Sequence, residues 1–178
     1  MESWEDSLVE PTHAEAFFSV SSTGEIHERL SYDYVDEGGY YRRVLSDQEL
    51  LDAEITKLST NMQRILDAER VEINGRRTMS DVEYVDIIMR DARSLVSAIF
   101  LIDFCGQFER INRIETWIEE EEAPYDFEIF WRFPRGTRLL EVHTQLEYDN
   151  HGDILSLWAS TGDRVGGYER LVFELPER

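Results

Sequence analysis

The stretch that decides the fold class is YDFEIFWRFPRGTRLLEVHTQLEY, residues 125–148. In its second part, two sets of side chains alternate along the chain: Leu140, Val142, Thr144 and Leu146 against Glu141, His143, Gln145 and Glu147. A period of two is that of a β-strand with one buried face and one face in water. The first part is rich in aromatic residues, and Pro134 and Gly136 indicate a turn between the two parts. The stretch therefore predicts two strands, 125–133 and 138–148.

Short runs of the same kind fill most of the chain on either side. They are rich in β-branched and aromatic residues, and they predict further strands at 15–21, 25–34, 82–90, 95–104, 111–119, 153–160 and 167–175. Asn74-Gly75 is the strongest short signal for a tight hairpin turn. Regularly spaced strands separated by turns favour an antiparallel sandwich or a partly closed barrel.

One segment has a helical pattern instead. The apolar residues that recur there every three or four positions are Leu51, Ile55, Leu58, Met62 and Ile65. At this spacing they share one face of a helix. Ser46 and Glu49 form a capping-box pattern at its start. The sequence therefore predicts an amphipathic helix over 46–68 that packs on the sheet.

Residues 81–104 fit two structures. Ser80 and Glu83 form a second capping-box pattern, and the apolar residues that follow also fit helical spacing. The β-branched residues of this segment and Phe100 favour strands. We predict two strands here, and a single helix is the alternative.

These elements together predict a β-rich α+β fold. An N-terminal β-hairpin and one amphipathic helix are expected to pack on an antiparallel β-sandwich or partly closed barrel. The length of 178 residues suits a single compact domain. Within it we expect an extended N-terminal arm at 1–13, the hairpin and helix at 14–67, and the β-rich part at 68–178.

The chain is strongly acidic throughout. Its 38 acidic and 18 basic residues give a net charge of −20, and Lys57 is the one lysine beside 17 arginines. Residues 1–67 and 68–178 each carry −10, so the excess is spread rather than confined to a tail. This balance argues against nucleic-acid binding, which requires clustered Lys and Arg.

An even acidic excess with little lysine is typical of a halophilic protein, whose surface works among solvent cations at high salt. Its self-repulsion is screened when salt is concentrated. A genome rich in G and C, which favours Arg over Lys, is the plain alternative. A mimic of nucleic acid is another, although a mimic would concentrate its charge on one face.

Several classes of protein are excluded by simple features. No apolar run reaches 18 residues and the first residues are acidic, so we expect neither membrane insertion nor a signal peptide, and a cytoplasmic or virion-associated location. A single cysteine, Cys105, rules out an internal disulfide and a cysteine-built zinc site. Cys105 and Asp103 follow an apolar run and are expected to be buried, Asp103 in a structural ion pair or as a functional acid.

Chemical motifs are mostly missing. There is no phosphate-binding loop, nucleophile elbow or His-Glu-x-x-His motif, and the sequence indicates no cofactor. Glu141, His143 and Glu147 would share one face of a strand and are candidate metal ligands. The same alternation also describes the solvent face of an amphipathic strand.

Aromatic residues are the remaining signal. The candidate interaction residues are Trp4, Leu8 and Val9 in the arm, and Trp117, Tyr125, Trp131 and Trp158 in the strands. Such residues are enriched at interfaces, but they also fill cores and line ligand pockets. The first functional hypothesis is a non-catalytic structural or interaction protein, self-associating or bound to protein partners in a larger assembly such as a virion or surface complex. The alternatives are a small-ligand-binding domain with a helix over an aromatic cavity, and a metal-assisted hydrolase centred on His143 and Glu141.

Overall fold

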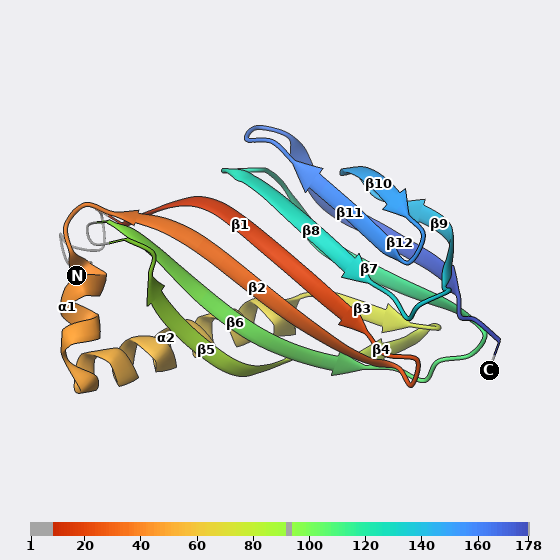
Figure 1. Ribbon diagram of the computed structural model, residues 1–178, viewed down its shortest axis with the longest axis horizontal. Helices are drawn as coiled ribbons and strands as arrows, with labels where there is room; N and C mark the ends of the chain where they lie inside the picture. Colours follow the sequence, from red (N-terminus) through yellow and green to blue (C-terminus); the bar gives the residue numbers. More distant parts are fainter. Residues whose placement is uncertain (1–8, 92–93, 178) are drawn as a thin grey trace.

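Two β-sheets that pack face to face, with two helices beside them, make up the molecule (Figure 1). It is described by a computed structural model over residues 9–91 and 94–177. Strands dominate, and the two sheets do not close into a barrel. The predicted β-rich α+β class is confirmed, and of the two architectures that the sequence left open, the sandwich is the one observed.

The larger sheet has seven strands in the described ranges, in the spatial order β10-β11-β8-β1-β2-β6-β5. Its strands are β1 (Val9–Val20), β2 (Glu25–Asp36), β5 (Asp81–Met89), β6 (Leu95–Cys105), β8 (Asp126–Arg132), β10 (Glu147–His151) and β11 (Ile154–Ala159). The smaller sheet has five, in the order β4-β3-β7-β12-β9. Its strands are β3 (Arg70–Ile73), β4 (Arg76–Thr78), β7 (Ile111–Glu122), β9 (Arg138–His143) and β12 (Arg164–Glu174). Paired strands run antiparallel except β1 and β8, which are parallel.

One face of the seven-stranded sheet, here called the inner face, is covered by two different layers. The helices α1 (Tyr40–Ser46) and α2 (Gln48–Ala68) lie over β5, β6 and part of β2, where Met62 packs with Phe100 and Ile102. The five-stranded sheet covers the rest, and its Phe173 joins the core that contains Trp131 and Leu155. Figure 1 shows the helices gathered at one end of the molecule and β9 and β12 toward the other. Neither described helix is long and apolar enough to span a membrane.

The short-range predictions for the strands are largely confirmed. Residues 81–104 form β5 and β6 rather than a helix, and the even-numbered side chains of β6 point into the core. Asn74 and Gly75 both have positive φ values, 52° and 75°, as the tight turn between β3 and β4 requires. β1 and β2 form the predicted N-terminal hairpin.

The start of the long helix differs from the prediction. Asp47, not Ser46, is the N-cap of α2, and its carboxylate accepts hydrogen bonds from the backbone N–H groups of Glu49 and Leu50. Ser46 ends α1 and donates its hydroxyl to the Arg43 carbonyl oxygen. The N-cap predicted at Ser46 was therefore wrong by one residue, because another helix, α1, ends at Ser46.

That first helix, α1, was not predicted at all. Tyr40 and Tyr41 look like strand residues, but their backbone N–H groups donate to the carboxylate of the buried Asp36, 2.9 Å away in each case. Both tyrosine hydroxyls then donate to Glu54 of α2. The contacts with Glu54 join two different helices, so the pattern around Tyr40 and Tyr41 alone does not reveal them.

Two further boundaries differ. The predicted strand 138–148 is wrong, because the chain leaves the five-stranded sheet after His143 and joins the seven-stranded sheet at Glu147. Val9–His13, assigned to an extended arm, are extended but belong to β1 and lie beside β2. Trp4 and Leu8 lie outside the described residues.

Candidate functional site

A cavity of about 330 Å³ lies at the junction of the three layers, between the inner face of the seven-stranded sheet, the end of α2 and the five-stranded sheet. Its floor is formed by β1, β2 and β8, and its roof includes Ile114 and Thr116 of β7 and Leu171 of β12. Most of the lining is apolar. Of the spaces found in the described part of the chain, this one has the lining that best fits a binding site.

Small side chains on β1 create the space. Ala14 and Ala16 are both buried on the inner face, and both line the cavity. Ala16 lies between Leu30 of β2 and Ile129 of β8, so its methyl group leaves a depression between two large neighbours. The floor of the cavity is therefore set by two alanines at alternate positions of one strand.

An aromatic stack forms one wall. Phe18 of β1 lies opposite Trp131 of β8, and the two rings are parallel with their centroids 4.0 Å apart. Phe104 of β6 meets Phe18 edge-on, with centroids 6.3 Å apart. Stacked and edge-to-face arrangements are the favoured geometries of aromatic pairs, and the three rings together form one wall of the cavity.

Glu28 is the unexpected residue in the floor. It lies on β2 between Ile26 and Leu30 of the same inner face and directly opposite Phe18. It lies deep between the layers, and the part of its surface that remains accessible faces the cavity. Burial raises the pKa of the Glu28 carboxyl to about 8, and the charge of Glu69 adds to this shift.

Glu69 faces Glu28 from the opposite layer. It is the C-cap of α2, directly after Ala68, and it lines the cavity. Burial raises the pKa of its carboxyl as well. Tyr32 and Tyr125 lie beside this pair. Burial raises the pKa of the Tyr32 hydroxyl, and neighbouring tyrosines and both carboxyls add to this shift. Two carboxyl groups and two tyrosines therefore surround one part of the cavity.

The mouth of the cavity is also acidic. Ile65 of α2 and Glu119 and Glu121 of β7 line the cavity and are exposed to solvent. Ile65 was predicted to share the buried face of the helix, but it is 53% exposed because this face turns toward Met62 and Leu66. It thus provides an apolar rim beside two acidic side chains.

Glu169 of β12 lines the far end of the cavity. Its carboxylate accepts a hydrogen bond from the Thr144 hydroxyl at 2.5 Å. Burial raises the pKa of the Glu169 carboxyl, partly offset by this hydrogen bond. Arg170, the neighbouring basic residue, forms an ion pair with Glu141, with Nε 3.0 Å from the carboxylate.

Of the aromatic residues predicted to mediate interactions, two belong to the cavity. Trp131 is buried in the stack with Phe18, and Tyr125 is half-buried beside Tyr32 with ring centroids 6.5 Å apart. Their positions fit core and lining roles.

The other predicted interaction residues lie elsewhere. Trp117 is on the outer side of the five-stranded sheet, where the Arg70 guanidinium lies 4.4 Å from its ring centroid. Trp158 is 36% exposed and donates its Nε1–H to Glu147. Val9 begins β1 and packs partly buried against the helix end of the core. The structure therefore does not unite these residues in one patch.

The predicted metal ligands are not brought together. Glu141 and His143 are on β9 of the five-stranded sheet, whereas Glu147 is on β10 of the seven-stranded sheet. The Glu141 carboxylate pairs with Arg170, and the His143 ring lies against Tyr168. Within the described ranges, no group of three or more His, Cys, Asp or Glu residues is placed to hold a metal ion. Glu141 and His143 thus stay in the same phase of one strand, and Glu147, the third residue of the predicted ligand set, lies on another sheet.

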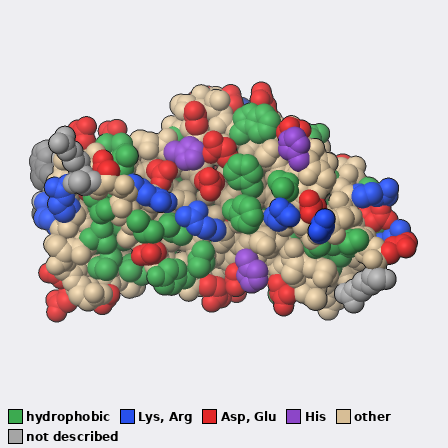
Figure 2. All heavy atoms as spheres, in the orientation of Figure 1, with side chains coloured by type: hydrophobic (Ala, Val, Ile, Leu, Met, Phe, Trp, Pro, Cys, Tyr) green, Lys and Arg blue, Asp and Glu red, His purple; other side chains and the backbone are tan. Residues whose placement is uncertain are grey.

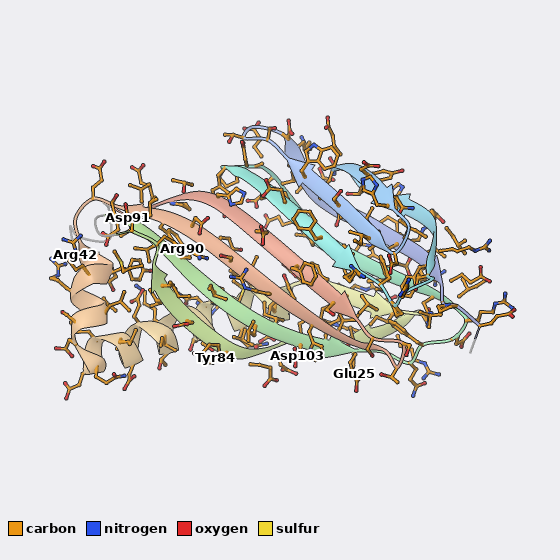
Figure 3. All side chains as sticks on the ribbon, in the orientation of Figure 1. Glu25, Arg42, Tyr84, Arg90, Asp91 and Asp103 are labelled. Carbon is orange, nitrogen blue, oxygen red and sulfur yellow. The ribbon has the colours of Figure 1, made fainter. Side chains whose placement is uncertain are left out.

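Asp103 and Cys105 are not core residues. Both lie on the outer face of the seven-stranded sheet, near the end of β6 where Glu25 of β2 also lies (Figure 3). Cys105 is exposed, so its predicted burial was wrong. Asp103 is 45% exposed at its side chain and pairs with His27 Nδ1 at 2.7 Å. Asp103 therefore has a hydrogen-bond partner, but at the surface rather than in the core.

One signal for the cavity is present in the sequence itself, although the motifs considered above do not include it. Ile26, Leu30 and Tyr32 alternate along β2 as inner-face residues, and Glu28 falls in the same phase. A carboxylate at an apolar position of a period-two strand marks an exception that needs explanation. Glu69, which comes from the end of a helix, carries no comparable local signal.

Replacing Glu28 with glutamine should stabilise the protein most at alkaline pH. In the folded state the carboxyl loses its proton near pH 8, and in the unfolded state near its ordinary value of 4.5. The folded state therefore holds the extra proton between these values, so wild-type stability falls as pH rises from 4.5 to 8. Glu28→Gln should be more stable by a few kcal/mol at pH 8 and much less so at pH 5.

Urea unfolding at the two pH values measures this difference. Glu10→Gln, which removes one negative charge from an exposed position of β1, is the matched control and should have little effect at either pH. A Glu28→Gln effect of equal size at pH 5 and pH 8 would show that the carboxyl titrates normally in the folded protein.

Comparisons with known proteins give no relationship that assigns a function. No family model matches the chain, and no curated protein matches it. Solved structures that match include a proposed protease from Parabacteroides distasonis ATCC 8503, with 10% identity, TM-score 0.30, and coverage of 96% of this chain and 41% of that one. An M1 zinc metallopeptidase from Deinococcus radiodurans matches with 8% identity, TM-score 0.32, and coverage of 93% and 42%. This chain thus spans about two fifths of the length of either structure, and likeness at this level carries no argument about fold or activity.

Proposed function

We propose that this protein binds a small, mainly apolar molecule in the cavity between its layers. The observation that carries the proposal is the cavity itself, whose volume of about 330 Å³ falls in the range of roughly 300–1,000 Å³ that is common for small-molecule sites. Its lining combines many apolar side chains with a few polar groups. This combination is typical of ligand pockets.

The construction of the floor supports the proposal. Well-packed cores fill the space between layers, and an empty volume costs stability in proportion to its size. Larger side chains at Ala14 and Ala16 would fill the depression beside Leu30 and Ile129. The parallel stack of Phe18 on Trp131 forms the wall beside this floor.

Filling the cavity should abolish binding. N-phenyl-1-naphthylamine, an uncharged apolar dye that fluoresces in apolar sites, is expected to bind wild-type protein with saturation. Ala16→Phe places a ring in the cavity and should weaken binding at least tenfold. Ser19→Phe adds the same ring to the solvent-facing side of β1 and should leave binding unchanged. Fluorescence titration of the three proteins, each checked for its thermal unfolding transition, gives the comparison.

Two results would contradict this proposal. The dye could fail to bind folded wild-type protein, or it could bind Ala16→Phe and Ser19→Phe with the same affinity as wild type. The second result would place the dye on the surface.

A second proposal is the structural or interaction role. Its support is the outer face of the seven-stranded sheet, which Figure 2 shows with hydrophobic side chains gathered between charged ones. The large apolar side chains exposed there are Phe17, Tyr84, Ile88, Leu95, Leu101 and Trp158. Tyr84 lies directly opposite Leu101, so some of them are contiguous. Apolar patches of this kind are typical of interaction surfaces, and we propose a second copy of the chain as the partner.

Light scattering after size exclusion tests this role. Wild-type protein should elute as a defined oligomer, and Leu101→Glu should convert it to a monomer of 21.0 kDa because a charge enters the centre of the patch. Leu140→Glu, on β9 of the other sheet and similarly exposed, is the control. A wild-type monomer at all concentrations, at both 0.15 M and 2 M KCl, would contradict the proposal.

We further propose that the acidic surface is adapted to high salt. The net charge of −20 repels itself at low ionic strength, and at 1 M salt the screening length is only about 3 Å. Wild-type protein should therefore melt several degrees higher in 2 M KCl than in 0.1 M KCl. Differential scanning calorimetry measures the two transitions, and equal melting temperatures would contradict a halophilic adaptation.

A further inference from the structure

The polar part of the cavity is formed by carboxyl groups and tyrosines. Across the space, the charge of Glu69 at the end of α2 contributes to the raised pKa of Glu28 on β2. Both carboxyls and Tyr125 contribute to the raised pKa of the Tyr32 hydroxyl. The rings of Tyr32 and Tyr125 meet edge-on at 83°. Two layers thus contribute acidic and aromatic groups to one small region.

These carboxyl groups have no counter-charge in the described part of the chain. No hydrogen bond or ion pair joins the side chain of Glu28 or Glu69 to another described residue. The basic residues that line the cavity are Arg170 and His143, and Arg170 already pairs with Glu141. A buried carboxylate without a partner is costly, so it either keeps its proton or takes a cation from outside.

The surroundings favour an organic cation over a metal ion. Metal ions of the calcium type require six or more oxygen ligands, and no group of three acidic or imidazole side chains is assembled in the described ranges. An ammonium group instead needs carboxylates and the faces of aromatic rings, with apolar walls for its substituents. Glu28, Glu69, Tyr32 and Tyr125 provide the first two, and Phe18, opposite Glu28 in register, begins the apolar wall.

The charge around the entrance also favours a cationic ligand. Glu119 and Glu121 lie at the mouth, and the whole surface carries a strong negative excess. Such a field raises the local concentration of cations and lowers that of anions. A fatty-acid carboxylate would meet Glu28 and Glu69, and Arg170, the guanidinium that lines the cavity, is already paired with Glu141.

We propose that the ligand of this cavity is an amphipathic organic cation, with its ammonium group between Glu28 and Glu69 beside Tyr32 and Tyr125, and its apolar part over Ala14 and Ala16 against Phe18 and Trp131. This inference rests on the proposed function, since it specifies the ligand of the same cavity. It would also explain why an apolar floor contains a carboxylate.

A matched series of ligands tests the proposal. Decyltrimethylammonium, decanol and decanoate share one chain and differ in head-group charge. Each is titrated below its micelle concentration against the protein loaded with N-phenyl-1-naphthylamine, in 1 M KCl so that general attraction to the acidic surface is screened. The cation should displace the dye at least tenfold more effectively than decanol, and decanoate should be weakest.

Variants locate the head group. Glu28→Gln and Glu69→Gln should each reduce the preference for the cation over decanol at least fivefold, with displacement by each ligand referred to that variant's own dye affinity. Glu10→Gln, which removes the same charge from an exposed site, should leave the preference unchanged. In wild type the affinity for the cation should rise between pH 6 and pH 9, as Glu28 loses its proton facing Glu69, Tyr32 and Tyr125, and this rise should be smaller in Glu28→Gln, which keeps Glu69 alone.

The outcomes separate the two proposals. Dye binding with equal displacement by all three ligands would overturn the cation while leaving the ligand-binding function in place. A cation preference that survives in both Glu28→Gln and Glu69→Gln would also overturn it, because the head group would then bind elsewhere. Failure of the dye and of every ligand to bind folded wild-type protein would overturn both.

Discussion

The wide inner face of the seven-stranded sheet is the constraint on which the rest of the structure depends. An apolar sheet face must be covered, and neither of the available layers is broad enough to cover this one alone. The helices bury the part around Phe100 and Ile102, and the five-stranded sheet buries the part around Trp131 and Leu155. Where these two layers of different shape meet, they leave a junction, here called the seam. The cavity lies at that seam, with the end of α2 on one side and β7 and β12 on the other.

The seam also explains how a carboxyl group is tolerated on an apolar face. Under the middle of either layer, Glu28 would have neither water nor a partner, and such burial is among the most costly substitutions in proteins. At the junction its accessible surface opens into the cavity, so a proton, water or a ligand can satisfy it. The position of Glu28 and the position of the cavity therefore have one structural cause.

The sequence predicts the parts of this structure that depend on local period. β-branched residues and Phe100 identify β5 and β6, Asn74-Gly75 gives a hairpin turn, and the stripe on α2 gives its length. It does not predict α1, because Tyr40 and Tyr41 resemble strand residues and their hydroxyl groups are bonded to Glu54 of α2 only in the folded structure. Nor does it show that the chain changes sheets between His143 and Glu147, since alternation continues across the break. The cavity could not be predicted from the sequence either, because Glu28 and Glu69 come together only through the packing of α2 on β2.

Stability alone would favour a different composition at the seam. Leucine at position 28 would match its neighbours Ile26 and Leu30, and larger residues than Ala14 and Ala16 would fill the floor. Each such change would remove a cost that the present sequence carries: an empty volume, or a carboxyl group away from bulk water. Proteins commonly hold strain and imperfect packing at the sites where they bind or react. Here two independent departures from good packing, the small floor and the acidic residue, fall within one space, and a ligand with an apolar body and a cationic head would compensate for both at once.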